Sequence, residues 1–280
     1  MEWWIGLGGS VLIAGAAYAK RSLSGSGLAA AVVLGTVMYG IGSAVWFGTL
    51  IAFFLSSTLL SRWKRKAKEQ AESGYEKSGR RDAGQVAANG GLALVLCVAA
   101  HWWPHPAWWY AFLGVMASVT ADTWATEVGG LSRTPPRSVL TGRRVAAGTS
   151  GGVTALGLAA SMAGGLFVGV VAWLLLQTAP GQIEPSGGAS PEWVRLAAWT
   201  ALGLFGGTIG SLADSVLGAT VQLTFRCRVC GRDIERPHHC GQPAARLRGC
   251  AGWNNDAVNV AGSLAGGAAA VAAAWLAGLL

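Results

Sequence analysis

The stretch AWWYAFLGVMASVTADTWATEVGG, residues 107–130, joins a long apolar run to two carboxylates, Asp122 and Glu127, close to its end. Its length suits a membrane-spanning helix, which needs roughly 20 mainly apolar residues. An ionisable side chain at membrane depth costs roughly 3 kcal/mol unless it is paired or binds a metal, so it indicates a functional role. The alternative is that both acids lie at the helix end, exposed to water. Because they are five residues apart, we expect them to serve different ligands or to require a local distortion of the helix.

The whole chain has the composition of an integral membrane protein. Of its 280 residues, 52% are hydrophobic and only 12% are charged, too few to cover a water-soluble globule of this size. We therefore expect an all-α, polytopic transmembrane helix bundle of about eight helices, forming a single transmembrane domain over residues 1–280. The stretch from Gly27 to Leu60 is too long for one span, and MYGIGS, ending at Ser43, is the expected turn within it. The expected spans cover residues 3–19, 26–44, 45–60, 85–101, 107–128, 150–178, 192–222 and 254–279.

The basic residues predict the orientation of these helices. Of the 21 Lys and Arg, all but Arg195 lie in four segments, at residues 20–21, 62–81, 133–144 and 226–248. If successive helices alternate in direction, the four segments share one side, which the positive-inside rule makes cytoplasmic. We expect a multi-pass protein of the cell (inner) membrane with both termini outside. The net charge of +8 follows from this topology and requires no nucleic-acid partner.

A cysteine- and histidine-rich segment, CRVCGRDIERPHHCG at residues 227–241, precedes the last helix. Thiolates and imidazoles at this spacing are typical of tetrahedral zinc sites, and a small cytoplasmic loop inserted at about 224–252 would gain order from the metal. His238 or Cys250 are alternative ligands, and a reduced loop without metal is the other interpretation. Four protein ligands leave no open position, so we expect a structural rather than a catalytic zinc. The expected ligands are Cys227, Cys230, His239 and Cys240.

Polar side chains recur at the cytoplasmic ends of other expected helices. Asn89 lies at the start of one and Asp214 near the end of another, and Asn255, Asp256 and Asn259 open the last. RDAGQVAANGG resembles NNDAVNVAGS, and ADTWATEVG resembles ADSVLGATVQ, but the two motifs occur in the opposite order in the second pair. This pattern indicates an internal repeat of a helix pair. We expect the two pairs to enclose one polar pocket that faces the cytoplasm.

The pocket has the residue types of a magnesium and phosphate site. Carboxylate and amide oxygens are the ligands that Mg²⁺ prefers. Arg143 and Arg144 precede GTSGG, residues 148–152, which leads into a helix. Glycines allow backbone amides to approach a ligand, Thr149 or Ser150 can cap the helix, and a helix start favours an anion. We interpret this loop as a phosphate cradle.

Four motifs carry a family resemblance: ADTWATEVGGLS, TGRRVAAGTSGGVT, GSLADSVLGATVQ and WNNDAVN. From about Gly27 to the carboxyl end, the chain resembles the integral membrane family of plant phytyl-phosphate kinase and transmembrane protein 19, known as domain of unknown function 92. It is more remotely similar to the CTP-dependent dolichol and phytol kinases. The resemblance implies a Mg²⁺-dependent lipid kinase that transfers a phosphoryl group from CTP or ATP to an isoprenoid monophosphate, such as a prenyl or phytyl monophosphate, to give the diphosphate.

This interpretation assigns a role to each polar group, and two rival functions remain. A transporter or flippase for a phosphorylated lipid would also use paired polar motifs at membrane depth, whereas a non-catalytic scaffold would leave the acids unexplained. For the kinase, the expected Mg²⁺ ligands are Asp122, Glu127, Asp214 and Asp256. The expected nucleotide- and lipid-phosphate-binding residues are Arg80, Arg81, Asn89, Arg143, Arg144, Gly148, Thr149, Ser150, Gly151, Asn255 and Asn259.

Overall fold

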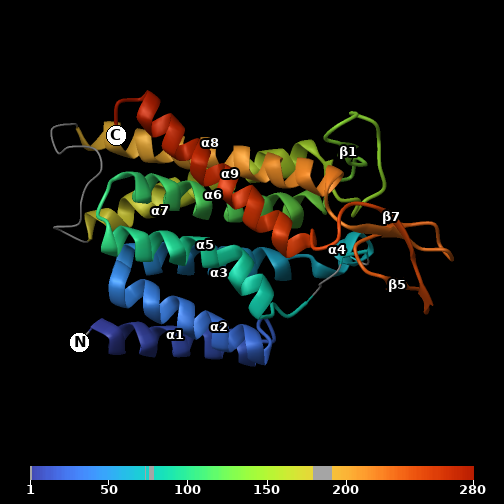
Figure 1. The fold of residues 1–280 in the computed structure, drawn as a ribbon, viewed down its shortest axis with the longest axis horizontal. Helices are drawn as coiled ribbons and strands as arrows, with labels where there is room; N and C mark the ends of the chain where they lie inside the picture. The colour runs from blue at the N-terminus through green and yellow to red at the C-terminus, as the bar shows by residue number, and fades with distance from the viewer. Residues whose placement is uncertain (1, 73, 76–78, 179–190) are drawn as a thin grey trace.

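The protein is a bundle of helices that run along the long axis of the molecule (Figure 1). The structure is a computed structural model and describes residues 2–72, 74–75, 79–178 and 191–280. Its long helices are α1 (Glu2–Ala19), α2 (Gly25–Val37), α3 (Ala44–Arg62), α5 (Ala83–Trp102), α6 (Ala107–Gly129), α7 (Ala155–Gln177), α8 (Glu192–Thr220) and α9 (Asn255–Leu276). A short helix α4 (Arg65–Glu72) follows α3, and a π-helical turn η1 (Met38–Gly42) follows α2.

Each apolar segment expected from the sequence is a helix, which confirms the all-α membrane bundle. Within the described ranges, six segments are long and apolar enough to cross a membrane: Gly25–Gly42, α3, α5, α7, α8 and α9. The apolar part of α1, Trp3–Ala19, is shorter, and α6, at the expected span 107–128, is not among the six. The expected turn near Gly40 is η1, whose C-cap residue Ser43 has a φ of 127°. The Ser43 hydroxyl then caps α3 by accepting a 3.3 Å hydrogen bond from the Val45 amide.

Helix α6 occupies the centre of the bundle. Every residue from 112 to 121 is buried, and α6 packs against α7, α8 and α9. Glycines allow this close packing: a Cβ at Gly206 of α8 would lie 3.1 Å from the Cα of Gly114 in α6. Because α6 is enclosed by other helices, the acids in its last turns lie inside the protein and do not face lipid.

The outer surface of the bundle is apolar. Large hydrophobic side chains are exposed on α1, α2, α3, α5, α7, α8 and α9, whereas α6 exposes none. Exposed aliphatic groups spread over the flanks of a bundle are expected where the solvent is the hydrocarbon of a bilayer. Examples are Leu12, Val33, Leu59, Val95, Leu174 and Leu264.

The described strands gather at one end of the bundle, opposite to the start of α1 and the end of α9 (Figure 1). The basic segments near α4, β1 and β7 lie at this same end, as alternating helix directions predict, and we call it the basic end. Strands β1 (Arg137–Ser138) and β2 (Gly152–Val153) form one antiparallel pair. After α8 come a three-stranded sheet, in the order β4 (Asp233–Ile234), β3 (Thr224–Arg226) and β7 (Ala245–Arg248), and the hairpin of β5 (His238–His239) and β6 (Gln242–Pro243).

Candidate functional site

A polar cavity of about 1190 Å³ lies at the basic end of the bundle. Ligand pockets commonly measure roughly 300–1,000 Å³, so this cavity has room for more than one small ligand. The structure brings most of the expected site residues to its wall: Arg80, Arg81, Asn89, Asp122, Glu127, Gly148, Thr149, Ser150, Gly151, Asp214, Asn255 and Asn259. Three expected residues, Arg143, Arg144 and Asp256, lie outside this lining.

Asp122 of α6 and Asp214 of α8 meet on one wall of the cavity. Their carboxylates are close enough for each charge to act on the other, and Ser211 forms a hydrogen bond with Asp122. Helix α9 closes the space behind them, because a Cβ at Gly262 would lie 3.0 Å from the Asp214 Cβ.

The chemistry of this pair fits a hard cation. The Oδ2 atom of Asp214 is buried and, among the described residues, has no hydrogen-bond donor. A buried carboxylate oxygen without a donor, next to a second carboxylate, is stabilised by a bound cation. Asn255 and Asn259 also line the cavity. The atoms available to bind a metal are therefore mainly carboxylate and amide oxygens, which Mg²⁺ prefers as ligands.

Glu127 has different partners from Asp122. Its carboxylate accepts hydrogen bonds from the Ser61 hydroxyl and from the Lys68 ammonium, with which it forms an ion pair. Lys68 comes from α4, is only 2% exposed, and also donates a 2.9 Å hydrogen bond to the Leu60 carbonyl oxygen. The five-residue offset between the two acids therefore places them against different partners.

The glycine-rich loop at residues 148–152 packs tightly on α8. Gly151 has a φ of +80°, and a Cβ there would contact the Ala219 side chain and lie 2.8 Å from the Ser215 carbonyl oxygen. Only glycine fits this position without strain. The loop leads into α7, whose N-cap is Thr154 rather than Thr149 or Ser150: its hydroxyl accepts a 2.9 Å hydrogen bond from the Gly157 amide.

The segment between α8 and α9 reaches this loop through Ser150. The Ser150 hydroxyl donates a 2.8 Å hydrogen bond to Glu235 Oε1, and Arg248 Nη2 donates one of 3.2 Å to the Ser150 carbonyl oxygen. The Glu235 amide in turn donates to the Gly74 carbonyl oxygen at 2.9 Å. Glu235 lines the cavity, and its charge adds to the negative field at Asp214.

Arg81 lies where α5 begins, and its main chain is fixed by two hydrogen bonds. Its amide donates to Ser22 at 2.9 Å, and its carbonyl oxygen accepts from the Ser24 amide at 3.0 Å. The guanidinium lies over the rings of Phe53 and Phe54, 5.9 and 5.7 Å from their centroids. Burial lowers the pKa of Arg81, and the charge of Glu127 acts in the opposite direction. Arg81 is therefore a second partly desolvated cation at the cavity, besides Lys68, whereas Arg80 is exposed.

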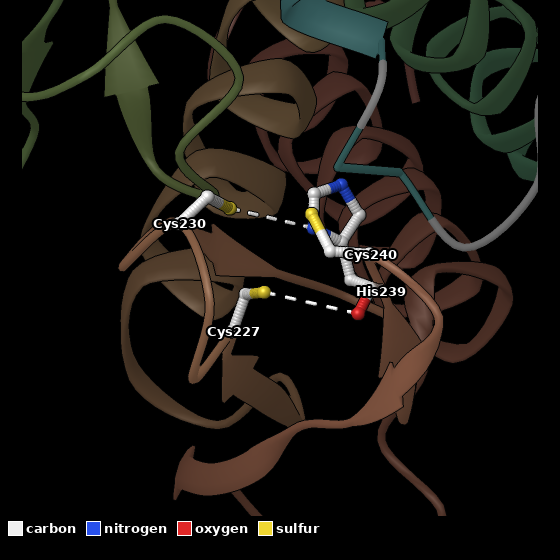
Figure 2. A group of neighbouring side chains, drawn as sticks. All are labelled: Cys227, Cys230, His239 and Cys240. Carbon is white, nitrogen blue, oxygen red and sulfur yellow. Dashed lines mark hydrogen bonds between the residues drawn. The ribbon is translucent and has the colours of Figure 1, made fainter.

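The four expected zinc ligands converge in space (Figure 2). Their ligand atoms all lie within 4.8 Å of one another, with His239 Nδ1 3.4 Å from the Cys230 sulfur and 3.2 Å from the Cys240 sulfur. A tetrahedral zinc with Zn–S of about 2.3 Å and Zn–N of about 2.0 Å sets nitrogen and sulfur roughly 3.5 Å apart. The cluster of Cys227, Cys230, His239 and Cys240 is therefore arranged to hold a metal such as zinc.

Two β-hairpins supply these ligands in pairs. Cys227 and Cys230 lie in the turn between β3 and β4, and His239 and Cys240 lie at the turn between β5 and β6. A hydrogen bond from the Cys230 backbone, followed by one with His239, lowers the pKa of the Cys227 thiol to about 6. A low thiol pKa favours the thiolate that binds metal. Cys250 lies outside the cluster.

Taken together, these features define a multi-pass helical membrane protein with a polar cavity at one end and a Cys/His cluster in the segment that borders it. The chain matches the family described as "Integral membrane protein DUF92" over residues 8–267, and it belongs to that family.

Three relatives illustrate the spread of the family. "Protein PGR" of Arabidopsis thaliana is 31% identical over 89% of this chain and 88% of its own length. "Uncharacterized membrane protein MJ0933" of Methanocaldococcus jannaschii is 28% identical over 71% of this chain and 75% of its own length. "Protein VTE6, chloroplastic" of Arabidopsis thaliana is 26% identical over 76% of this chain and 60% of its own length. No solved structure matches the chain.

Proposed function

We propose that this protein is a membrane lipid kinase that transfers the terminal phosphoryl group of CTP or ATP to an isoprenoid monophosphate. The observation that carries the proposal is the single cavity shared by Asp122, Asp214, the glycine-rich loop and Arg81. Paired carboxylates, backbone amides of a glycine-rich loop and a partly buried cation are parts that phosphoryl transfer uses. The motif resemblance to the family of phytyl-phosphate kinase, together with membership of that family, supports the same reaction.

The cavity residues divide into two groups in this proposal. Asp122 and Asp214 would hold Mg²⁺, which neutralises phosphate charge when it is bound. Glu127 was expected to share this role, but its contacts support a different one: it forms an ion pair with Lys68 and so fixes a positive charge at the cavity wall. Asp256, outside the cavity lining, acts at most indirectly.

The remaining groups would position the two phosphate substrates. The amides of Gly148, Ser150 and Gly151 hold the nucleotide phosphates, and Arg81 holds the lipid phosphate. An oxygen of the lipid phosphate attacks the γ-phosphorus, the bond from that phosphorus to the β–γ bridging oxygen breaks, and a nucleoside diphosphate leaves. The attacking oxygen is already anionic, so the reaction needs no strong general base.

The proposal requires that the cavity opens toward the cytoplasm, where nucleoside triphosphates are available. The basic residues at the cavity end support this orientation through the positive-inside rule. Both termini would then lie outside. A reporter fused to the carboxyl terminus that is active only on the outer face of the membrane tests the orientation, and activity of a cytoplasmic reporter there would contradict it.

A direct assay separates the kinase from the transporter or flippase. Purified protein receives Mg²⁺, labelled CTP or ATP, and farnesyl, geranylgeranyl or phytyl monophosphate; the kinase produces a labelled lipid diphosphate. Movement of lipid monophosphate across proteoliposomes without any labelled product would support the transporter. Helices α7 and α8 are continuous over 23 and 29 residues, so these two helices lack the breaks common in transporter sites.

A further inference from the structure

A second, apolar cavity lies beside the polar one. This slot has a volume of about 60 Å³ and is enclosed by α1, α2, α3 and α5. Its wall is almost wholly hydrocarbon and aromatic, with Ala14, Ala31, Leu34, Phe47 and Phe54 among the lining side chains.

The slot and the polar cavity share part of their wall. Arg81, Gln85 and Asn89 line both of them. Gln85 and Asn89 lie one turn apart on α5, and Asn89 Nδ2 donates a 2.9 Å hydrogen bond to the Gln85 carbonyl oxygen. Arg81 is the cation at this boundary, and its guanidinium lies over two rings, Phe53 and Phe54, that line the slot. An anionic group on the polar side and a hydrocarbon on the apolar side therefore meet the same three residues.

We propose that the slot binds the first part of the hydrocarbon chain of a single-chain lipid monophosphate, with its phosphate at Arg81. This inference rests on the proposed kinase function and names the lipid-binding site within it. An amphiphile with an anionic head satisfies both sides of the boundary, because the guanidinium pairs with phosphate and the slot removes apolar surface from water.

The dimensions and position of the slot select the kind of lipid. A volume of about 60 Å³ holds only a short part of one hydrocarbon chain, so a lipid with a single chain next to its phosphate fits better than phosphatidic acid, whose phosphate is joined to a branched glycerol. The helices around it, α2, α3 and α5, are candidate membrane spans, so the remainder of the chain would continue toward the bilayer. Arg80 lines the polar cavity but not the slot, whereas Arg81 lines both.

Photo-crosslinking tests the site without requiring turnover. The full-length protein in detergent is irradiated with dodecyl monophosphate that carries a diazirine near the phosphate end, and labelled peptides are mapped by mass spectrometry. We expect the label on slot residues of α1, α2, α3 or α5, displaced by excess dodecyl monophosphate but not by dodecanol or phosphatidic acid. Label confined to other helices, or equal competition by dodecanol or phosphatidic acid, would overturn the inference.

A matched pair of substitutions strengthens the test. Ala31→Phe fills the slot and should reduce labelling about tenfold, which corresponds to about 1.4 kcal/mol. Ala29→Phe adds the same ring to an exposed position of the same helix and should change labelling by no more than about twofold. Equal labelling of the two folded variants contradicts the proposed site. If Ala31→Phe does not fold, the label position in the unaltered protein decides the question.

The outcomes separate this inference from the kinase proposal. Labelling in the slot without formation of lipid diphosphate would support the lipid-binding site and contradict the kinase proposal. Formation of lipid diphosphate with the label elsewhere would support the kinase proposal and contradict lipid binding in the slot.

Discussion

The hydroxyl of Ser150, in the glycine-rich loop, donates a 2.8 Å hydrogen bond to the carboxylate of Glu235, 85 residues later in the chain. Glu235 follows β4, which pairs with β3 directly before the Cys227 turn. The bond therefore joins the Cys/His segment to the loop that we propose holds nucleotide phosphate. It gives the Cys/His segment a physical connection to the cavity that its composition alone did not indicate.

Removing the Glu235 carboxylate should loosen this loop. A hydrogen bond to a charged group contributes roughly 1.5–3 kcal/mol, so Glu235→Ala should raise the KM for the nucleotide about tenfold or more. Glu235→Gln retains an acceptor and should have a smaller effect. Asp233→Asn, which disturbs only a half-exposed ion pair with Arg226, is the matched control. Steady-state kinetics with varied nucleotide would contradict the link if Glu235→Ala left KM unchanged.

The two converging carboxylates should be essential for phosphoryl transfer. Asp122→Asn and Asp214→Asn remove charge at nearly constant volume, and each should lower kcat by about 100-fold or more, as loss of a main electrostatic group does. Glu192→Gln, at the exposed opposite end of α8, should leave kcat unaltered. Near-normal turnover of either Asp variant would remove that residue from the proposed metal site.

The Lys68–Glu127 ion pair predicts a stability effect that does not depend on catalysis. Replacing one partner of a buried pair leaves an uncompensated charge and costs roughly 3–5 kcal/mol, so Lys68→Met should clearly lower the melting temperature. The double variant Lys68→Met with Glu127→Gln removes both charges and should recover part of the loss. Thermal unfolding in detergent measures both, and strictly additive losses would show that the two groups do not interact.

The Cys/His cluster should retain zinc through purification without chelators. Elemental analysis should find about one zinc ion per chain, as a four-ligand structural site requires. Cys227→Ser combined with Cys230→Ser should abolish the zinc and lower the melting temperature. Cys250→Ser, at a cysteine outside the cluster, should change neither. Zinc-free protein of unaltered stability would refute the metal site.

The sequence predicted the membrane bundle because its signals are local. Each span is an apolar run bounded by polar residues, and the Cys/His spacing is contained within 15 residues, 227–241. The sequence also placed Asp122 and Asp214 at the same end of the bundle, because both lie near the carboxyl ends of α6 and α8, which run in the same direction when successive helices alternate. Such features need no knowledge of how distant segments pack.

Two cavity residues were missed for the opposite reason. Lys68 lies within a run of basic residues that otherwise indicates only topology, and its partner Glu127 is 59 residues away. Glu235 lies within the Cys/His motif and has no pattern of its own, and its position depends on how the segment contacts Ser150 and Gly74. Arg143 and Arg144 were expected in the cavity because they precede the glycine loop, but the lining includes neither. The Ser138 amide donates to the Arg143 carbonyl oxygen at 2.9 Å, so this stretch pairs with the neighbouring β1 strand.

If the protein is a lipid kinase, this cavity transfers a phosphoryl group to lipid. A single-turnover assay measures this step: excess purified protein is mixed with γ-labelled CTP or ATP, Mg²⁺ and an isoprenoid monophosphate, and the lipid fraction is analysed by chromatography. We expect labelled isoprenoid diphosphate with the unaltered protein and with Glu192→Gln, and none with Asp214→Asn. Absence of labelled lipid diphosphate with every nucleotide and lipid tested, in protein shown to be folded, would contradict the kinase proposal.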